Sequence, residues 1–147
     1  RYRRRPYPSR RMTQDNQAAV QPVNVPEILE EVTKLCDLYE KALMENDLDT
    51  LDALFWESEQ TLRYGVAENL YGISEIRDFR KGRSGGSPQR EVIRRQITTF
   101  GGDCAVCDLE FQRPGAAVRG RQSQTWIRTA SGWKVAAAHV SLMGNTH

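Results

Sequence analysis

The spacing of apolar residues changes near residue 90, and this change limits the possible folds more than any other feature. Before it, apolar residues recur every three or four positions, as they do in helices with one buried face. After it, apolar and polar residues alternate in four runs, which is typical of strands. These runs cover 90–100, 104–113, 121–130 and 132–143, with glycine-containing turns between them. The second part of the chain therefore predicts an antiparallel sheet.

The first part predicts three helices. Asn24 lies near the N-cap of the first, Pro26 suits its first turn, and its buried face ends where Asn46 and Asp47 interrupt the pattern. Segments 48–55 and 72–81 predict the other two helices, with a strand over 59–65 between them. This order favours the α+β class, with three helices packed on one curved, mainly antiparallel sheet.

One domain accounts for the folded part of the chain. A length of 147 residues with 39% hydrophobic residues is enough for one core. We expect residues 25–147 to form this single domain. Residues 1–24 lack apolar periodicity, and we expect them to be a disordered extension or an artefact that is not native to the protein. Met12 resembles a natural start. The alternative for this segment is an arm that binds nucleic acid or a membrane surface.

Composition argues against several classes of protein. Six of the 21 basic residues precede the first acid, which leaves 15 against 19 acidic residues, a net charge near −4. Neither this balance nor the placement of aromatic residues favours nucleic-acid binding. No apolar stretch approaches the roughly 20 residues of a membrane span. Three cysteines suit a reducing, cytoplasmic compartment, and Cys104 and Cys107 would point to opposite faces of a strand.

The last strand predicts two faces with different uses. Simple alternation places Trp133, Val135, Ala137, His139 and Ser141 on the inner face. The outer face then carries small apolar residues, among them Ala136, Ala138 and Val140. Since a monomer would expose this patch, we expect a homodimer through the outer sheet face.

Several polar residues are predicted to meet inside the fold. The strand 121–130 places Gln122, Gln124 and Trp126 on one face, near His139 and Ser141. Arg63 from the first strand and Tyr39 from the first helix complete the set. Apolar walls, one cation and several hydrogen-bonding groups favour a cavity for a small anionic substrate. With only two histidines and no cofactor motif, we expect no metal and no cofactor.

Each of these residues also has a purely structural interpretation. Tyr39 fits a helix core, and Arg63 can pair with Glu68 on the surface. A single histidine such as His139 is usually structural, and Trp126 is first of all a core residue. The interpretation of Arg90, Arg94 and Arg95 as a solvated, salt-bridged face is preferred to a phosphate site.

The element order and the final string GWKVAAAHVS resemble the nuclear transport factor 2-like superfamily, in which SnoaL-like members bind small molecules inside a cone. The strings LRYGVAENLYGISEIRDFRKGR, RRQITTFGGDCAVCDLEF and GRQSQTWIRTASGWKVAAAHVS resemble the AtzH-like family, which includes the HpxZ proteins. The resemblance covers about residues 25–143. It implies a curved-sheet cone of the SnoaL type.

The same resemblance implies an enzyme. Family members act as decarboxylating amidohydrolases that convert 1,3-dicarboxyurea to allophanate in cyanuric acid breakdown, and others accompany purine and oxalurate catabolism. The essential tyrosine and arginine of the family match Tyr39 in LCDLYEKAL and Arg63 in LRYG. From the residues themselves, Gln124, His139 and Ser141 are predicted to orient the second carboxylate of such a substrate or a water, and Trp126 to contact the substrate. The alternative is a non-catalytic dimer that binds a small acid, or an accessory protein of an amidase pathway.

Overall fold

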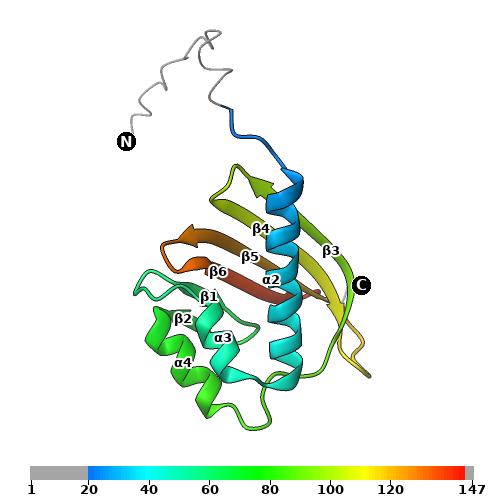
Figure 1. Cartoon of the computed structure of the whole chain (residues 1–147). Helices are drawn as coiled ribbons and strands as arrows, with labels where there is room; N and C mark the ends of the chain where they lie inside the picture. Colours follow the sequence, from blue (N-terminus) through cyan, green and yellow to red (C-terminus); the bar gives the residue numbers. More distant parts are fainter. Residues whose placement is uncertain (1–19, 145–147) are drawn as a thin grey trace, which may run out of the picture.

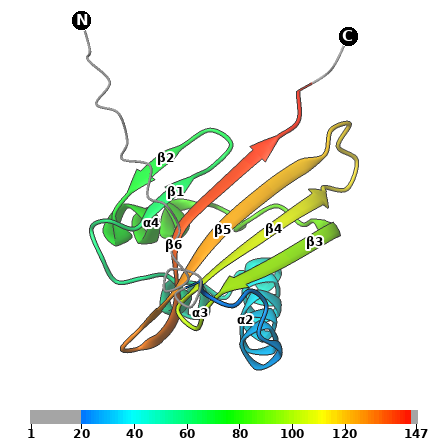
Figure 2. The ribbon, with the colours of Figure 1, turned by 90° about the horizontal axis from the view of Figure 1, so that it is seen from above.

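The computed structural model describes residues 20–144, which form two layers. Helices α2 (Pro26–Glu45), α3 (Leu48–Leu54) and α4 (Ile73–Gly82) lie on one face of a curved sheet (Figures 1 and 2). The sheet contains β1 (Leu62–Tyr64), β2 (Asn69–Tyr71), β3 (Glu91–Phe100), β4 (Cys104–Gln112), β5 (Gly120–Thr129) and β6 (Gly132–Leu142). The predicted α+β class and the three-helix, curved-sheet arrangement are confirmed.

The sheet is mixed because of a single parallel pair. The strand order is β2-β1-β6-β5-β4-β3, and β1 runs parallel to β6 while the other neighbours are antiparallel. This order lets the long strands β3 to β6 form a curved surface over which α2 lies (Figure 1). The short β1–β2 hairpin extends the sheet beside α4 (Figure 2).

The start of α2 differs in one detail from the prediction. The N-cap residue is Val25, and no side chain caps the helix. Asn24, predicted near this cap, has a φ of 56° and its side-chain oxygen instead accepts a hydrogen bond from the backbone N–H of Thr99 at 2.8 Å. Val23 also bridges to Phe100. Residues just before the helix thus tie it to β3, although the predicted extension ran to residue 24.

The first strand is shorter than predicted, and one strand was missed. Residues 59–65 contain only the three-residue strand β1, and β2 follows after a tight turn. In this turn the backbone N–H of Gly65 donates to the carbonyl oxygen of Glu68 at 2.8 Å. A three-residue strand is too short to show an alternating pattern, so β2 leaves no signal in the sequence.

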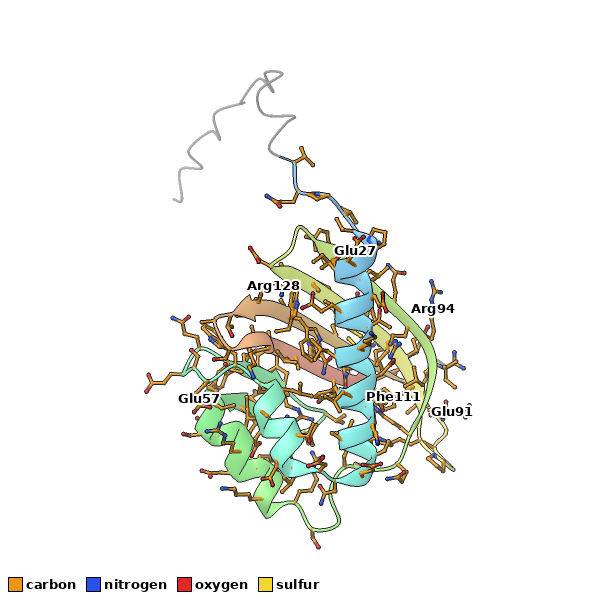
Figure 3. The ribbon with its side chains drawn as sticks, viewed as in Figure 1. Glu27, Glu57, Glu91, Arg94, Phe111 and Arg128 are labelled. Carbon is orange, nitrogen blue, oxygen red and sulfur yellow. The ribbon has the colours of Figure 1, made fainter. Side chains whose placement is uncertain are left out.

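Side chains from both layers form the core between α2 and the sheet. Buried residues of the main cluster include Val32, Tyr39, Phe55, Trp126 and Val135, each at most 4% exposed. Phe111 belongs to a smaller cluster toward the other end of β4. Phe111 is fully buried on the inner face of β4, and Figure 3 labels it beside the C-terminal half of α2.

The packing of Phe111 on Gly120 gives a prediction about stability. The two residues are register partners on β4 and β5, and a Cβ atom at Gly120 would lie 2.1 Å from the Phe111 ring. Because Phe111 is fully buried, we expect Gly120→Ala to lower the free energy of unfolding by about 1–3 kcal/mol. Urea denaturation measures this change.

A matched control is available at Gly102. A Cβ atom there would meet nothing within 4 Å, so Gly102→Ala should change the free energy of unfolding by less than about 0.5 kcal/mol. Equal urea midpoints for Gly120→Ala and the native protein would contradict the prediction, because they would show that the Phe111 ring can move aside without cost.

Two predictions about the N-terminal segment concern residues outside the described part of the chain. These are the arginine-rich segment and the start at Met12, both within residues 1–19. In the part that is described, none of the helices has the length and apolar character needed to cross a membrane.

Candidate active site

A cavity of about 360 Å³ opens between the C-terminal half of α2 and the sheet. Its walls come from five parts of the chain: α2, the β1–β2 hairpin, the segment between α4 and β3, the residue after β4, and the inner faces of β5 and β6. A narrower pocket under α3 and α4 adjoins it and shares Tyr39 and Arg63. The volume suits a small molecule rather than a polymer.

Tyr39 forms part of the cavity wall. It lies on the buried face of α2, is 4% exposed, and its ring packs 6.2 Å from the ring of Phe55. The same residue lines the cavity, so Tyr39 belongs both to the core and to the cavity wall. The structural interpretation and a functional role for Tyr39 are therefore compatible.

Arg63 lines the same cavity from β1. Its register partner on β6 is Ala138. The Arg63 Nη1 atom donates to Glu68 Oε1 at 2.8 Å, which confirms the predicted ion pair. This pair is not on the open surface, because the two side chains are only 13% and 20% exposed. One carboxylate occupies a fraction of the five guanidinium N–H donors, so others are free to bind a ligand.

Three further arginines line the cavity, and sequence reasoning did not place them there. Arg83 follows α4, Arg90 precedes β3, and Arg113 follows β4. Arg90 makes a bidentate pair with Glu40 of α2, at 2.9 and 2.7 Å. The sequence predicted a salt-bridged Arg90 on a solvated face. The ion pair is present, but the Arg90 side chain is only 4% exposed.

The cavity is electropositive, and Arg83 shows the effect. Burial lowers the pKa of its guanidinium, and the neighbouring charge of Arg63 lowers the pKa further, while Glu68 opposes these effects. A bound anion would relieve the repulsion between these cations. The arrangement therefore favours a ligand with negative charge.

His139 and Ser141 do not reach this cavity, and the reason is a bulge in β6. Thr125 pairs with Ala137 but Trp126 pairs with Val135, so Ala136 is an extra residue in β6. One extra residue reverses the faces of all residues that follow it. His139 is therefore exposed on the outer face, where its ring lies 5.6 Å from that of Tyr64.

The same bulge contradicts the predicted dimer patch. Ala138 and Val140 point inward and are only 5% and 8% exposed within a single chain, and Val140 lines the cavity. They cannot form an outer patch together with Ala136. The outer face that the structure does present is polar beside β3 to β5, with Arg94, Asp108 and Arg121 lining a shallow depression. The homodimer itself stays a prediction.

The predicted inner face of β5 is correct, but the glutamine that lines the cavity is Gln122 and not Gln124. Gln122, Gln124 and Trp126 are all buried. Gln124 accepts a hydrogen bond from the indole N–H of Trp126 at 3.2 Å, deep in the core, and neither residue lines the cavity. Gln122 does line it. The structure therefore brings Tyr39 and Arg63 together and leaves the four predicted substrate-binding residues outside.

The model for the AtzH-like family matches residues 21–146 of the chain. The chain belongs to the AtzH-like family. A search of curated proteins gives no match for this AtzH-like protein.

Several solved structures are similar to the chain. The AtzH-like chain is 49% identical to a protein of unknown function from the DUF3225 family of Pectobacterium atrosepticum, with a TM-score of 0.82, covering 85% of this chain and 99% of that one. It is 43% identical to a cystatin-like fold protein from Burkholderia xenovorans, with a TM-score of 0.81 and coverage of 86% and 99%. A nuclear transport factor 2-like protein from Salmonella enterica, at 21% identity, a TM-score of 0.68 and coverage of 82% and 94%, shows the fold alone. The predicted SnoaL-like cone is confirmed.

The cysteines of this AtzH-like protein are free, and they bear out the predicted strand geometry. Cys107 is buried on the inner face of β4 while Cys104 is partly exposed. Within residues 20–144, no cluster of three histidine, cysteine or acidic side chains is placed to hold a metal ion.

Proposed function

We propose that the chain removes one carboxyl group from a small carboxylated urea, 1,3-dicarboxyurea, to give allophanate, as a small enzyme of cyanuric acid or related nitrogen catabolism. The observation that carries this proposal is that Tyr39 and Arg63 line one cavity of about 360 Å³. Membership of the AtzH-like family supports the same reaction class. The fold alone would not support a reaction class, because this fold hosts many functions.

In the proposed reaction, Arg63 binds a substrate carboxylate through guanidinium donors that Glu68 leaves free. The bond between the departing carboxyl carbon and the urea nitrogen breaks, and its electron pair stays on nitrogen. Tyr39 donates its hydroxyl proton to that nitrogen as carbon dioxide leaves. The dianion has then become the allophanate monoanion, and solvent returns a proton to Tyr39.

The cavity arginines supply a fixed positive field for this step. Negative charge moves from the departing carboxyl group onto nitrogen, and guanidinium groups already in place stabilise it without reorganisation. Burial among Leu43 and Val140 strengthens the field, because apolar walls screen charges less than water does. Ketosteroid isomerase, an example of this kind of pocket, uses a tyrosine as donor to an oxyanion.

The direct test is turnover. The purified protein, treated with a chelator, is mixed with freshly made 1,3-dicarboxyurea, and allophanate is followed by ¹³C NMR against the spontaneous rate. We expect clear acceleration that survives chelation. Thermal stabilisation by malonate without acceleration would favour the alternative, a protein that only binds a small acid.

A further inference from the structure

Two of the cavity arginines share an aromatic surface on the side of β1. The guanidinium carbons of Arg63 and Arg83 lie 5.8 and 4.5 Å from the centre of the Phe79 ring of α4. Both guanidinium groups approach Glu68 Oε1, at 2.8 and 3.6 Å. One carboxylate between two guanidinium groups leaves a net charge of +1 on this side.

The other two cavity arginines share a second aromatic surface, on the side of β4. The guanidinium carbons of Arg90 and Arg113 lie 4.6 and 5.6 Å from the centre of the buried Phe111 ring. Arg90 is neutralised by its bidentate pair with Glu40. Arg113 takes part in none of the ion pairs within residues 20–144, and its buried Nε atom has no hydrogen-bond partner there.

A buried N–H group without an acceptor is costly, so the position of Arg113 needs an explanation. Packing on Phe111 orders the guanidinium but satisfies none of its donors. The cavity that Arg113 lines can supply the acceptor in the form of an anion. A carboxylate bound in the cavity would therefore satisfy a donor of Arg113 that the protein leaves without an acceptor.

Arg63 and Arg113 enter the cavity from parts of the sheet that are not neighbours. In the sheet order, β6 and β5 lie between β1 and β4, so the backbones of β1 and β4 are roughly 14 Å apart at the usual spacing. Arg63 extends from β1 and Arg113 from the residue that follows β4, and the charge of Arg113 still reaches Arg83, where it lowers the pKa of the guanidinium. The space left between them suits a small molecule with a carboxylate at each end.

We propose that Arg113 binds the second carboxylate of the ligand, opposite the one bound by Arg63, and thereby makes the cavity prefer dianions to monoanions. The identity of the substrate rests on the proposed function, but the preference for two carboxylates does not. Gln124, His139 and Ser141 were predicted for this part of the substrate, and none of them lines the cavity.

Isothermal titration with malonate and with acetate, at fixed pH and ionic strength, tests this role. We expect Arg113→Gln to weaken malonate binding by about 10- to 100-fold and acetate binding by less than about twofold. Arg113→Lys should lie between, because one ammonium replaces a planar fork. Arg119→Gln is the matched control, since Arg119 is an exposed residue near the same turn and does not line the cavity.

Unchanged malonate affinity in Arg113→Gln would overturn the proposal, as would an equal loss for both anions or a native protein that does not prefer malonate. If Arg113→Gln does not fold, the same comparison of malonate and acetate affinity is made with Arg113→Lys. The proposed function fails separately: selective malonate binding that depends on Arg113, with no turnover of 1,3-dicarboxyurea, removes the enzyme and keeps the site. Normal turnover and a normal KM in Arg113→Gln would remove the proposed role of Arg113 and keep the enzyme.

Discussion

Tyr39→Phe should lower the rate of allophanate formation by about 10²- to 10⁴-fold while the protein stays folded. The substitution removes only the hydroxyl group, which is the proposed proton donor to the urea nitrogen. The ring keeps its place in the buried face of α2, beside Phe55. Steady-state kinetics with 1,3-dicarboxyurea measures the rate, and a thermal melt reports whether folding is retained.

A matched control separates this effect from the general loss of a tyrosine. Tyr71 on β2 is 56% exposed and lies outside the cavity, so Tyr71→Phe should leave the rate within about twofold of the native value. If Tyr39→Phe is as fast as the native protein, the proton on the urea nitrogen comes from another group.

Arg63→Lys should also cause a large loss, about 10²- to 10³-fold in kcat/KM. A lysine at this position keeps the charge but has a single ammonium in place of a planar fork. It would also form its shortest contact with Glu68, which leaves fewer donors for the substrate. Most of the loss should therefore appear even though the net charge of the cavity is unchanged.

Arg94→Lys provides the comparison for this substitution. Figure 3 shows Arg94 pointing away from α2 at the edge of the sheet, and the residue lines a depression on the outer face rather than the cavity. Its replacement should leave kcat/KM unaltered. Native kcat/KM in Arg63→Lys would mean that charge alone, and not the geometry of the guanidinium, binds the carboxylate.

Local sequence patterns were sufficient to predict most of the architecture. The apolar spacing along α2 and the alternation along β4 and β5 arise from contacts with one opposing layer, so they are visible in the sequence. Tyr39 was identified because it belongs to the buried face of α2, and Arg63 because the predicted strand over 59–65, which is longer than β1, placed it on the face opposite Leu62.

The bulge in β6 was not predictable from alternation. Ala136 lies in a run of three alanines, and residues of equal size and polarity give no contrast that would reveal an extra residue. All assignments after it, including His139, were therefore placed on the wrong face. The three consecutive alanines were the only available sign that the register there is weakly specified.

The remaining cavity residues depend on contacts between distant parts of the chain. Arg90 pairs with Glu40, fifty positions away in the sequence, and Arg113 meets the cavity because β4 ends beside it. No local spacing records such contacts. An arginine between a helix and a strand, or directly after a strand, looks like an ordinary surface residue until the fold brings it inside.

We propose that Tyr39 and Arg63 bind one small dianion in a common cavity. A crystal structure of the protein soaked with malonate, a stable dicarboxylate, tests it most directly. The prediction is malonate inside the cavity, with one carboxylate on the Arg63 guanidinium and within reach of the Tyr39 hydroxyl. Malonate bound only on the outer sheet face, or a cavity left without it at saturating concentration, would contradict the claim.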